Sequence, residues 1–342
     1  MLSKRLFSTV ICTLGLLASA VVVSALPYTE LSRTSLPGNE GWDYLSIDAN
    51  ARLMYISRST RMVIFNIDTH KVVGEIPNLQ GVHGVAIASA AGKGYTSNGR
   101  SNDVTVFDLK TFKTLATIPV GKGPDAILFD PASKRVFTFN GGENSATAID
   151  AGTDKVVGTV ELGGRPEAGV ADGRGTIHVN IEDKSEIATF SASSLKVSAR
   201  HSIAPGDGPS GLAYDAAKKR LFSVCSNQKM MVQDATGKAP VMEIAIGKGP
   251  DACAFDPIKH LVFASNGRDG TLTVVEEAGA SAYKVRETAK TEPGARTMAL
   301  DLKTHHIFTV SARMMPPAPG ETNMRRRSYE PGSFVVLEYG EK

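Results

Sequence analysis

The side chains best suited to chemistry in this chain recur at a regular spacing. All but one of them stand five residues before an aspartate, and successive members are 40 to 45 residues apart. The seven positions are Asp43, His83, Asp125, Glu167, Ser210, Asp251 and Arg296. A fold that gathers them would place four carboxylates, an imidazole, a hydroxyl and a guanidinium in one site. Such a set predicts binding of a cation or a polar ligand, or acid–base chemistry by the imidazole.

The spacing also identifies the elements that must position these residues. The hexapeptide Gly-Lys-Gly-Pro-Asp-Ala occurs at 121–126 and again at 247–252, which is 126 residues, or three times 42, further on. Each repeat holds four short segments rich in Val, Ile, Phe and Thr and bounded by turn residues. In the third repeat these segments are 126–129, 135–139, 145–149 and 155–160.

Four strands in a unit of this length are typical of a propeller blade. We therefore predict an all-β, seven-bladed β-propeller over residues 26–342, with no core helix. The last repeat ends with a strand at 333–339 and is one strand short. Residues 29–36 resemble a fourth strand, so we expect this N-terminal strand to close the last blade and remove an exposed sheet edge.

In a propeller, the loop before the first strand and the loop after the second strand open on the same face. The seven positions are therefore expected to ring one mouth of the central channel. Fifteen residues after each position, second strands are expected to end and to form an outer polar ring. Its members are Arg58, Asn98, Asn140, Cys225, Asn266 and Ser311, with Asn180 as the nearest equivalent in the fourth repeat. We predict ligand binding by the first ring together with Arg58, Asn98, Asn140 and Asn266.

The crowded carboxylates require compensation by a cation, by a raised pKa or by arginine pairing. Oxygen ligands with one imidazole suit Ca²⁺, Mg²⁺ or Mn²⁺ better than a soft metal. The metal-ligand candidates are Asp43, His83, Asp125, Glu167 and Asp251, and His83 is also the candidate general base. A structural interpretation stays open, because polar side chains at this position also satisfy backbone groups around a water-filled channel. Trp42 and Tyr44 flank Asp43, and one of them is expected to face the mouth.

The last repeat contains an insertion over 313–331, where the other repeats have about five residues. It carries Arg325, Arg326 and Arg327 and leaves from the ringed face. Two interpretations remain: a solvated surface loop, or a lid that supplies cationic groups to the mouth.

Composition points to an exported protein. Residues 1–25 have the charged start, the apolar run and the small-residue end of a signal peptide, so we expect a periplasmic or secreted chain. An uncleaved membrane anchor is the alternative, which the length of the apolar run just allows. No later stretch is apolar enough to span a membrane. The full chain carries a net charge of +3, and loss of the leader removes only Lys4 and Arg5, which argues against a nucleic-acid partner. Cys225 and Cys253 remain, either as buried thiols or as a disulfide.

The repeats resemble the YVTN-type β-propellers, and in particular the secreted YncE-like proteins. The stretches that carry the resemblance are 81–85 (GVHGV), 96–100 (TSNGR), 104–109 (VTVFDL), 180–186 (NIEDKSE) and 294–301 (GARTMALD). The resemblance covers essentially the whole mature chain and implies seven blades. The resemblance implies little about activity, because propellers of this architecture include binding proteins as well as lactonases and lyases.

The sequence predicts an exported module that binds a small polar ligand or a protein partner at the ringed mouth. The alternative is a lactonase-like, divalent-metal-assisted hydrolase or lyase that uses His83 and the acidic ring. A purely structural or redox-partner module is a third and weaker interpretation. The sequence contains no Cys-x-x-Cys-His, His-Glu-x-x-His, Gly-x-Ser-x-Gly or Walker motif.

Overall fold

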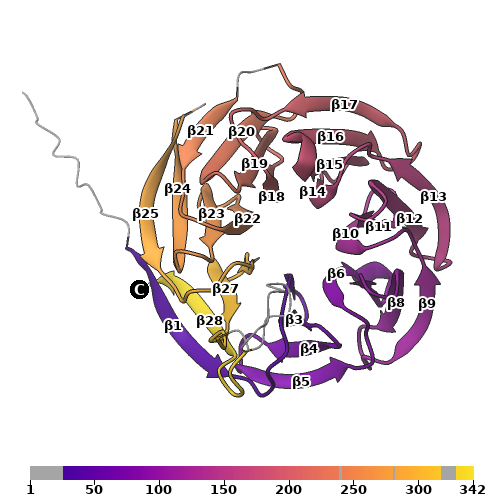
Figure 1. Ribbon diagram of the computed structural model, residues 1–342, viewed down its shortest axis with the longest axis horizontal. Coiled ribbons are helices and arrows are strands. Elements are labelled where there is room, and N and C mark those ends of the chain that lie inside the picture. The colour runs from indigo at the N-terminus through magenta and orange to yellow at the C-terminus, as the bar shows by residue number, and fades with distance from the viewer. Residues whose placement is uncertain (1–25, 239–240, 280–281, 317–328) are drawn as a thin grey trace, which may run out of the picture.

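The repeats fold as four-stranded antiparallel sheets set around a central axis (Figure 1). The computed structural model describes residues 26–238, 241–279, 282–316 and 329–342. Seven sheets lie in these ranges, which confirms the all-β, seven-bladed propeller. The helical segments there are two short 3₁₀ turns, η1 (Ser89–Ala91) and η2 (Glu182–Lys184), in keeping with the predicted lack of a core helix.

Each of the first three blades runs in chain order from the innermost strand to the outermost. Blade 1 comprises β2 (Leu45–Asp48), β3 (Leu53–Arg58), β4 (Arg61–Asn66) and β5 (Lys71–Ile76). Blade 2 comprises β6 (Val82–Ala88), β7 (Lys93–Asn98), β8 (Asp103–Asp108) and β9 (Thr114–Pro119). Blade 3 comprises β10 (Pro124–Asp130), β11 (Arg135–Asn140), β12 (Ser145–Asp150) and β13 (Lys155–Glu161).

The next three blades repeat this order. Blade 4 comprises β14 (Pro166–Ala171), β15 (Thr176–Ile181), β16 (Glu186–Ser191) and β17 (Val197–Ser202). Blade 5 comprises β18 (Pro209–Asp215), β19 (Arg220–Cys225), β20 (Lys229–Asp234) and β21 (Met242–Ala245). Blade 6 comprises β22 (Pro250–Asp256), β23 (Leu261–Asn266), β24 (Thr271–Gly279) and β25 (Ala282–Lys290).

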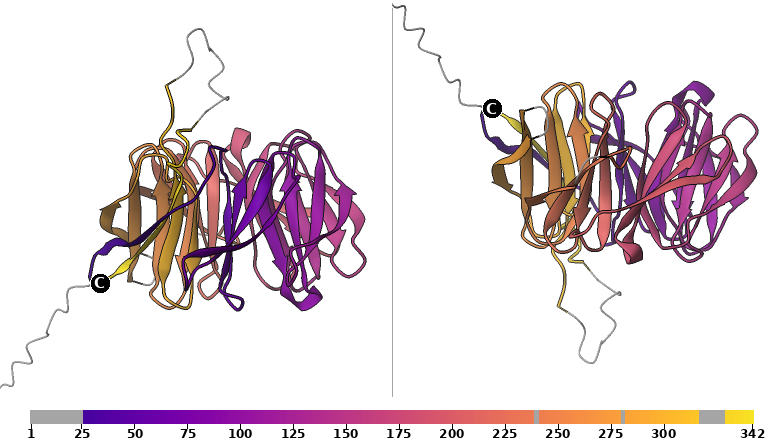
Figure 2. Two further views of the ribbon diagram at one scale, coloured as in Figure 1. Left: turned by 90° about the horizontal axis from the view of Figure 1, so that it is seen from below. Right: turned by 90° about the horizontal axis from the view of Figure 1, so that it is seen from above.

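Blade 7 joins the two ends of the chain. It comprises β26 (Met298–Asp301), β27 (His306–Ser311), β28 (Val335–Glu341) and, outermost, β1 (Tyr28–Ser35). β1 pairs antiparallel with β28 from Tyr28 opposite Glu341 to Ser35 opposite Val335. Figure 2 shows the indigo β1 running along the outer side of the ring beside the yellow C-terminal strand. The predicted closure by residues 29–36 is thus present in the structure.

The core lies between the blades. Seven clusters of buried apolar side chains are found in the described part of the chain, and each joins two neighbouring blades. Every first strand also contacts the first strands on both sides, so β2, β6, β10, β14, β18, β22 and β26 form a closed circuit around the channel. This circuit is the frame that carries the predicted ring of chemical groups.

The aspartates five residues after the ring positions lie at the other end of the first strands. Oδ2 of Asp130, for example, accepts a hydrogen bond from the Ser133 backbone N–H at 2.9 Å and so fixes the turn into β11. Equivalent turn bonds are made by Asp48, Asp172, Asp215, Asp256 and Asp301. Their role is structural, as the sequence pattern indicates.

Candidate functional site

The repeated hexapeptide explains how a ring side chain reaches the channel. Gly123 takes the left-handed conformation (φ +59°) and Pro124 then begins β10. Pairing of β10 with β11 is irregular between Pro124 and Ile127, so Asp125 stands in a bulge outside the ladder. Bulges of this kind redirect a side chain, here toward the channel. The same irregularity opens β6, β14, β18 and β22 around or beside the ring residue.

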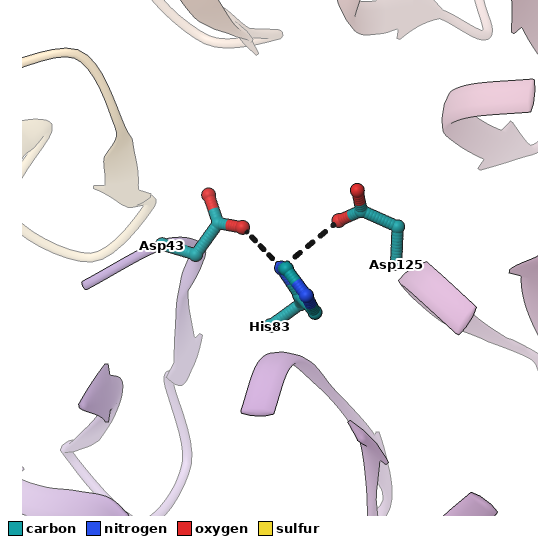
Figure 3. Close-up of side chains that lie close together, drawn as sticks. All are labelled: Asp43, His83 and Asp125. Carbon is teal, nitrogen blue, oxygen red and sulfur yellow. Dashed lines mark hydrogen bonds and ion pairs between the residues drawn. The ribbon is translucent and has the colours of Figure 1, made fainter. Parts of the chain in front are cut away.

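The centre of the site is His83, which lies between two aspartates from neighbouring blades (Figure 3). Its Nδ1–H donates to Oδ2 of Asp43 at 2.6 Å, and Oδ1 of Asp125 is 3.4 Å from the same nitrogen. The other ring nitrogen, Nε2, lies against Gly99, where an added Cβ would come within 2.7 Å. The three side chains keep between 18% and 34% of their surface exposed, so the cluster is reached from the channel.

Arg296 extends this cluster around the ring. Its Nη1 lies 3.2 Å from Oδ1 of Asp43 and also pairs with Asp251. Its Nη2 donates to the backbone oxygen of Trp42 at 2.8 Å, which fixes the plane of the guanidinium. Five ring residues from five blades thus form one continuous charged network, in the order Asp251, Arg296, Asp43, His83 and Asp125.

One half of the network has compensated charges. Burial would raise the pKa of Asp43, but the hydrogen bond from His83 and the charge of Arg296 outweigh it and lower that pKa. Burial would likewise lower the pKa of His83, but the bond to Asp43 and the charge of Asp125 raise it. Asp43 is therefore the carboxylate that holds both cationic groups in place.

The other carboxyls of the ring have raised pKa values. Burial raises the pKa of Asp125 to about 6, with His83 opposing and the charges of Asp43 and Asp251 adding to the rise. Burial also raises the pKa of Asp251 although Arg296 opposes it. The pKa of Glu167 rises to about 9 through burial, the charge of Asp125 and a hydrogen bond with Glu182. Burial is the main cause of each rise and neighbouring carboxylates add to it, so a bound cation or hydrogen-bond donor would offset part of the cost of ionising these groups.

Glu182 was not among the predicted site residues, and Tyr44 was predicted only as one of two neighbours of Asp43, one of which would face the mouth. Glu182 stands fifteen residues after Glu167, the same spacing as the outer ring, and that spacing was the signal that identifies it. Tyr44 belongs to blade 1, yet it packs against the cluster between blades 3 and 4 and so reaches across the channel. Burial and the charges of Asp125 and Asp43 raise its pKa well above the usual value. Trp42, by contrast, packs in the core on Phe334.

The outer ring lies beneath the surface instead of lining the mouth. Asn140 is fully buried and its Nδ2 donates to Oγ1 of Thr147 at 2.9 Å, inside its own blade. Asn98 and Asn266 make the equivalent bonds to Thr105 and Thr273. The first glycine of the hexapeptide permits this packing, since a Cβ on Gly121 would lie 2.5 Å from Nδ2 of Asn140. We predicted that these asparagines bind ligand, but their side chains have almost no exposed surface through which they could do so.

Arg58 and Ser210 are also held by the scaffold. Arg58 has no exposed surface, stacks 3.7 Å above the Phe334 ring and pairs with Glu40 at 2.8 Å. Burial lowers its pKa to about 10. The Ser210 hydroxyl donates to the backbone oxygen of Pro250 at 3.2 Å. These polar groups hold neighbouring blades together and stand outside the charged network.

A metal ion fits one part of the ring. One oxygen of Asp43, one of Asp125 and a ring nitrogen of His83 all lie within 4.8 Å of one another. Glu167 and Asp251, the other predicted ligands, are not in this group. Two carboxylates and an imidazole suit a hard or borderline divalent cation. Since Nδ1 is the nitrogen that faces the carboxylates, His83 serves through that atom either as a ligand or as a base, and not as both.

Two further expectations concern other parts of the chain. Cys225 and Cys253 are free thiols, the first buried and the second half-buried. Of the insertion over 313–331, residues 317–328 lie outside the described residues, and Arg325, Arg326 and Arg327 are among them. The signal peptide predicted for residues 1–25 also lies outside. At the base of the insertion, the Tyr329 ring packs against Trp42 at a tilt of 46°, with ring centroids 4.9 Å apart.

Fold and site together define a seven-bladed β-propeller with a charged network at one channel mouth. No protein-family model matches the chain, and no curated protein matches it in sequence. Among solved structures, Kuenenia stuttgartiensis hydrazine synthase is similar, with a TM-score of 0.70 and 16% identity over 82% of this chain and 94% of that one. A likeness at this identity shows the propeller fold alone. Within the described residues, no helix has the length and apolar character needed to cross a bilayer.

The raised pKa of Glu167 gives a pH-dependent prediction. The folded protein holds the proton up to about pH 9, whereas the unfolded chain releases it near pH 4.5, so this group lowers stability progressively as pH rises between those values. Glu167→Gln should therefore raise the free energy of unfolding by about 1–2 kcal/mol at pH 8 and change it little at pH 4. Thermal melts at both pH values measure the difference. The exposed Glu161→Gln is the control, and an equal gain at both pH values would contradict the assignment.

Proposed function

We propose that this protein is an exported, YncE-like binding module whose channel mouth receives a small polar ligand through a cationic or hydrogen-bond-donating group. The observation that carries the proposal is the meeting of Asp43, His83 and Asp125, from three blades, in a cluster that stays partly exposed. A scaffold that needed only backbone bonds would not bring carboxylates this close, because their mutual repulsion costs stability.

The sign of the preferred ligand charge follows from the ring. Asp43 is matched by His83 and Arg296, while Asp125 has an Oδ1 atom that is buried without a hydrogen-bond partner. An ammonium group or a divalent cation beside Asp125 would supply that partner and offset the negative charge of Asp251. A protein partner would act through the same contact if it presents a lysine side chain.

The second candidate is divalent-metal-assisted hydrolysis or elimination, as in a lactonase-like enzyme. It is favoured by the three donor atoms within 4.8 Å. Asp43, His83 and Asp125 would hold the ion, which supplies Lewis-acid polarisation of a substrate carbonyl. With His83 engaged as a ligand, the remaining candidates for proton transfer are Glu167, with its pKa of about 9, and the Tyr44 hydroxyl across the channel.

A titration with defined probes tests both candidates. Elemental analysis of undialysed protein is followed by calorimetry with MnCl₂, MgCl₂ and CaCl₂ and, separately, with the diamine putrescine. Binding of putrescine without a stoichiometric metal supports the binding module, and one tightly bound divalent ion per chain supports the metal site. In either case Asp125→Asn should weaken binding at least about tenfold, by loss of a charged contact. If neither metal nor diamine binds, the proposed cationic ligand is wrong.

The exported location is part of the same proposal and rests on the composition of residues 1–25. Mass spectrometry of protein recovered from outside the cytoplasm tests it, since cleavage of the leader requires a mature chain that begins at Leu26.

A further inference from the structure

A hollow separate from the acidic ring opens on the same face, above blade 7. Its volume is about 840 Å³, within the size range of small-molecule sites. Its walls come from the blade 6 loops around Gly249 and Gly267, from blade 7 and from Trp42. Arg296 is the ring residue that lines it, so the hollow adjoins the charged network.

The lining is strongly cationic. Four arginines are among the lining residues, Arg33, Arg268, Arg296 and Arg313, against one acidic residue, Glu292. Three of these arginines form ion pairs with acidic residues. Nε of Arg313, for example, lies 2.6 Å from Oε2 of Glu330. No ion pair with a described residue is recorded for Arg268, which is exposed at the rim of the hollow. Because a planar guanidinium grips a carboxylate or phosphate through two parallel bonds, this rim selects an anionic group.

One wall of the hollow is aromatic. Trp42 and Tyr329 both line it, with ring centroids 4.9 Å apart, and Phe334 supports the indole from the side at 5.5 Å. Trp42 is 8% exposed and its Nε1–H is buried without an acceptor. The two rings are tilted by 46° to each other, and an aromatic ligand can pack against this apolar wall.

We propose that the hollow is a second binding site, which takes a small aromatic anion: the ring against Trp42 and Tyr329, and the carboxylate or phosphate on Arg268 and Arg313. The site goes beyond the proposed function, because its charge preference is opposite to that of the acidic mouth. Arg296 borders both sites. A ligand with an ammonium group at one end and an aromatic carboxylate at the other would fill both at once.

The sole tryptophan of the chain provides a direct measurement, because Trp42 lines the hollow and no other indole contributes to the fluorescence. Benzoate and its neutral isostere benzamide are titrated separately while the Trp42 emission is recorded. Benzoate should change the emission with a Kd of about 1 mM, as expected for a fragment of this size. Benzamide should bind at least about fivefold more weakly, because it lacks the charge that the arginines recognise.

Variants identify the contact. Arg268→Gln should weaken benzoate about five- to tenfold and leave benzamide unchanged, since only the charged bond is lost. Arg174→Gln removes an exposed arginine at the turn after β14, on the opposite face, and should change neither titration. Asp125→Asn, which should weaken cation binding, should leave benzoate binding intact, so failure of the two proposals can be told apart. Equal affinity for benzoate and benzamide, or an unchanged benzoate affinity in Arg268→Gln, would overturn the assignment.

Discussion

Deletion of residues 26–38 should lower the midpoint of thermal unfolding by about 10 °C or more. The segment contains β1, whose Tyr28 is 3% exposed and packs in the cluster between blades 6 and 7. It also contains Leu36, which packs in the cluster between blades 7 and 1. Loss of one buried aromatic side chain alone costs about 3–5 kcal/mol, and each kcal/mol corresponds to about 2–4 °C in a domain somewhat smaller than this one.

The comparison uses a chain that begins at Leu26 and one that begins at Asn39. Deletion leaves β28 with an unpaired edge, so the shorter chain should also aggregate more readily. A synthetic peptide of residues 26–38 should bind that edge by strand addition and restore much of the lost stability. If the two chains melt together, or if the peptide has no effect on a destabilised truncated chain, the closing strand does not have this role.

Replacement by asparagine should lower the free energy of unfolding at one aspartate of the cluster and leave it unchanged or raise it at another. Asp43→Asn leaves His83 and Arg296 without their shared carboxylate, and we expect a loss of about 2–4 kcal/mol at pH 7. Asp125→Asn removes a carboxylate whose pKa is raised to about 6, so we expect unchanged or slightly greater stability. Chemical denaturation at pH 7 measures both.

The pH dependence separates these effects from simple packing changes. The stability that Asp43 provides is present above its ordinary pKa and is lost as pH falls through its lowered folded pKa, so the deficit of Asp43→Asn should shrink in acid. The gain of Asp125→Asn should also vanish below about pH 4, where both folded and unfolded carboxyls are protonated. Asp269→Asn serves as the control. Asp269 lies in an exposed loop of blade 6 and accepts a hydrogen bond from the Lys248 backbone N–H, so this variant shows what the same substitution does to the stability of a loop alone. A destabilising Asp125→Asn would contradict the proposed imbalance of charge.

The repeat spacing predicted the blades, the closing strand and the ring positions because each depends on where strands begin. Asp125 reaches the channel since a proline and a bulge follow a left-handed glycine, as they also do at Gly208-Pro209 and Gly249-Pro250, and the Gly-Pro step is visible in the hexapeptide. The outer ring was harder to predict. Side chains alternate between the two faces of a strand, so a residue at the end of β11 such as Asn140 turns inward or outward according to a single step of register.

Contacts between residues on opposite sides of the channel also could not be predicted from the sequence. Nothing in the chain order pairs Tyr44 of blade 1 with blades 3 and 4, since that contact depends on the diameter of the closed ring. The bond between Glu167 and Glu182 depends likewise on how two loops of one blade fold over each other. The ionisation of the ring follows from these contacts, so residue types alone predicted a charged mouth without showing which half is compensated.

The order of charges around the ring breaks the sevenfold symmetry of the scaffold. Both cationic members, His83 and Arg296, flank Asp43 in blade 1, while the carboxyls with raised pKa values belong to blades 3, 4 and 6. The mouth therefore has an electric dipole directed across the channel, although the backbone is nearly the same in every blade. A dipolar ligand that could enter a symmetric ring in seven equivalent orientations would settle in one, with its positive end turned away from blade 1.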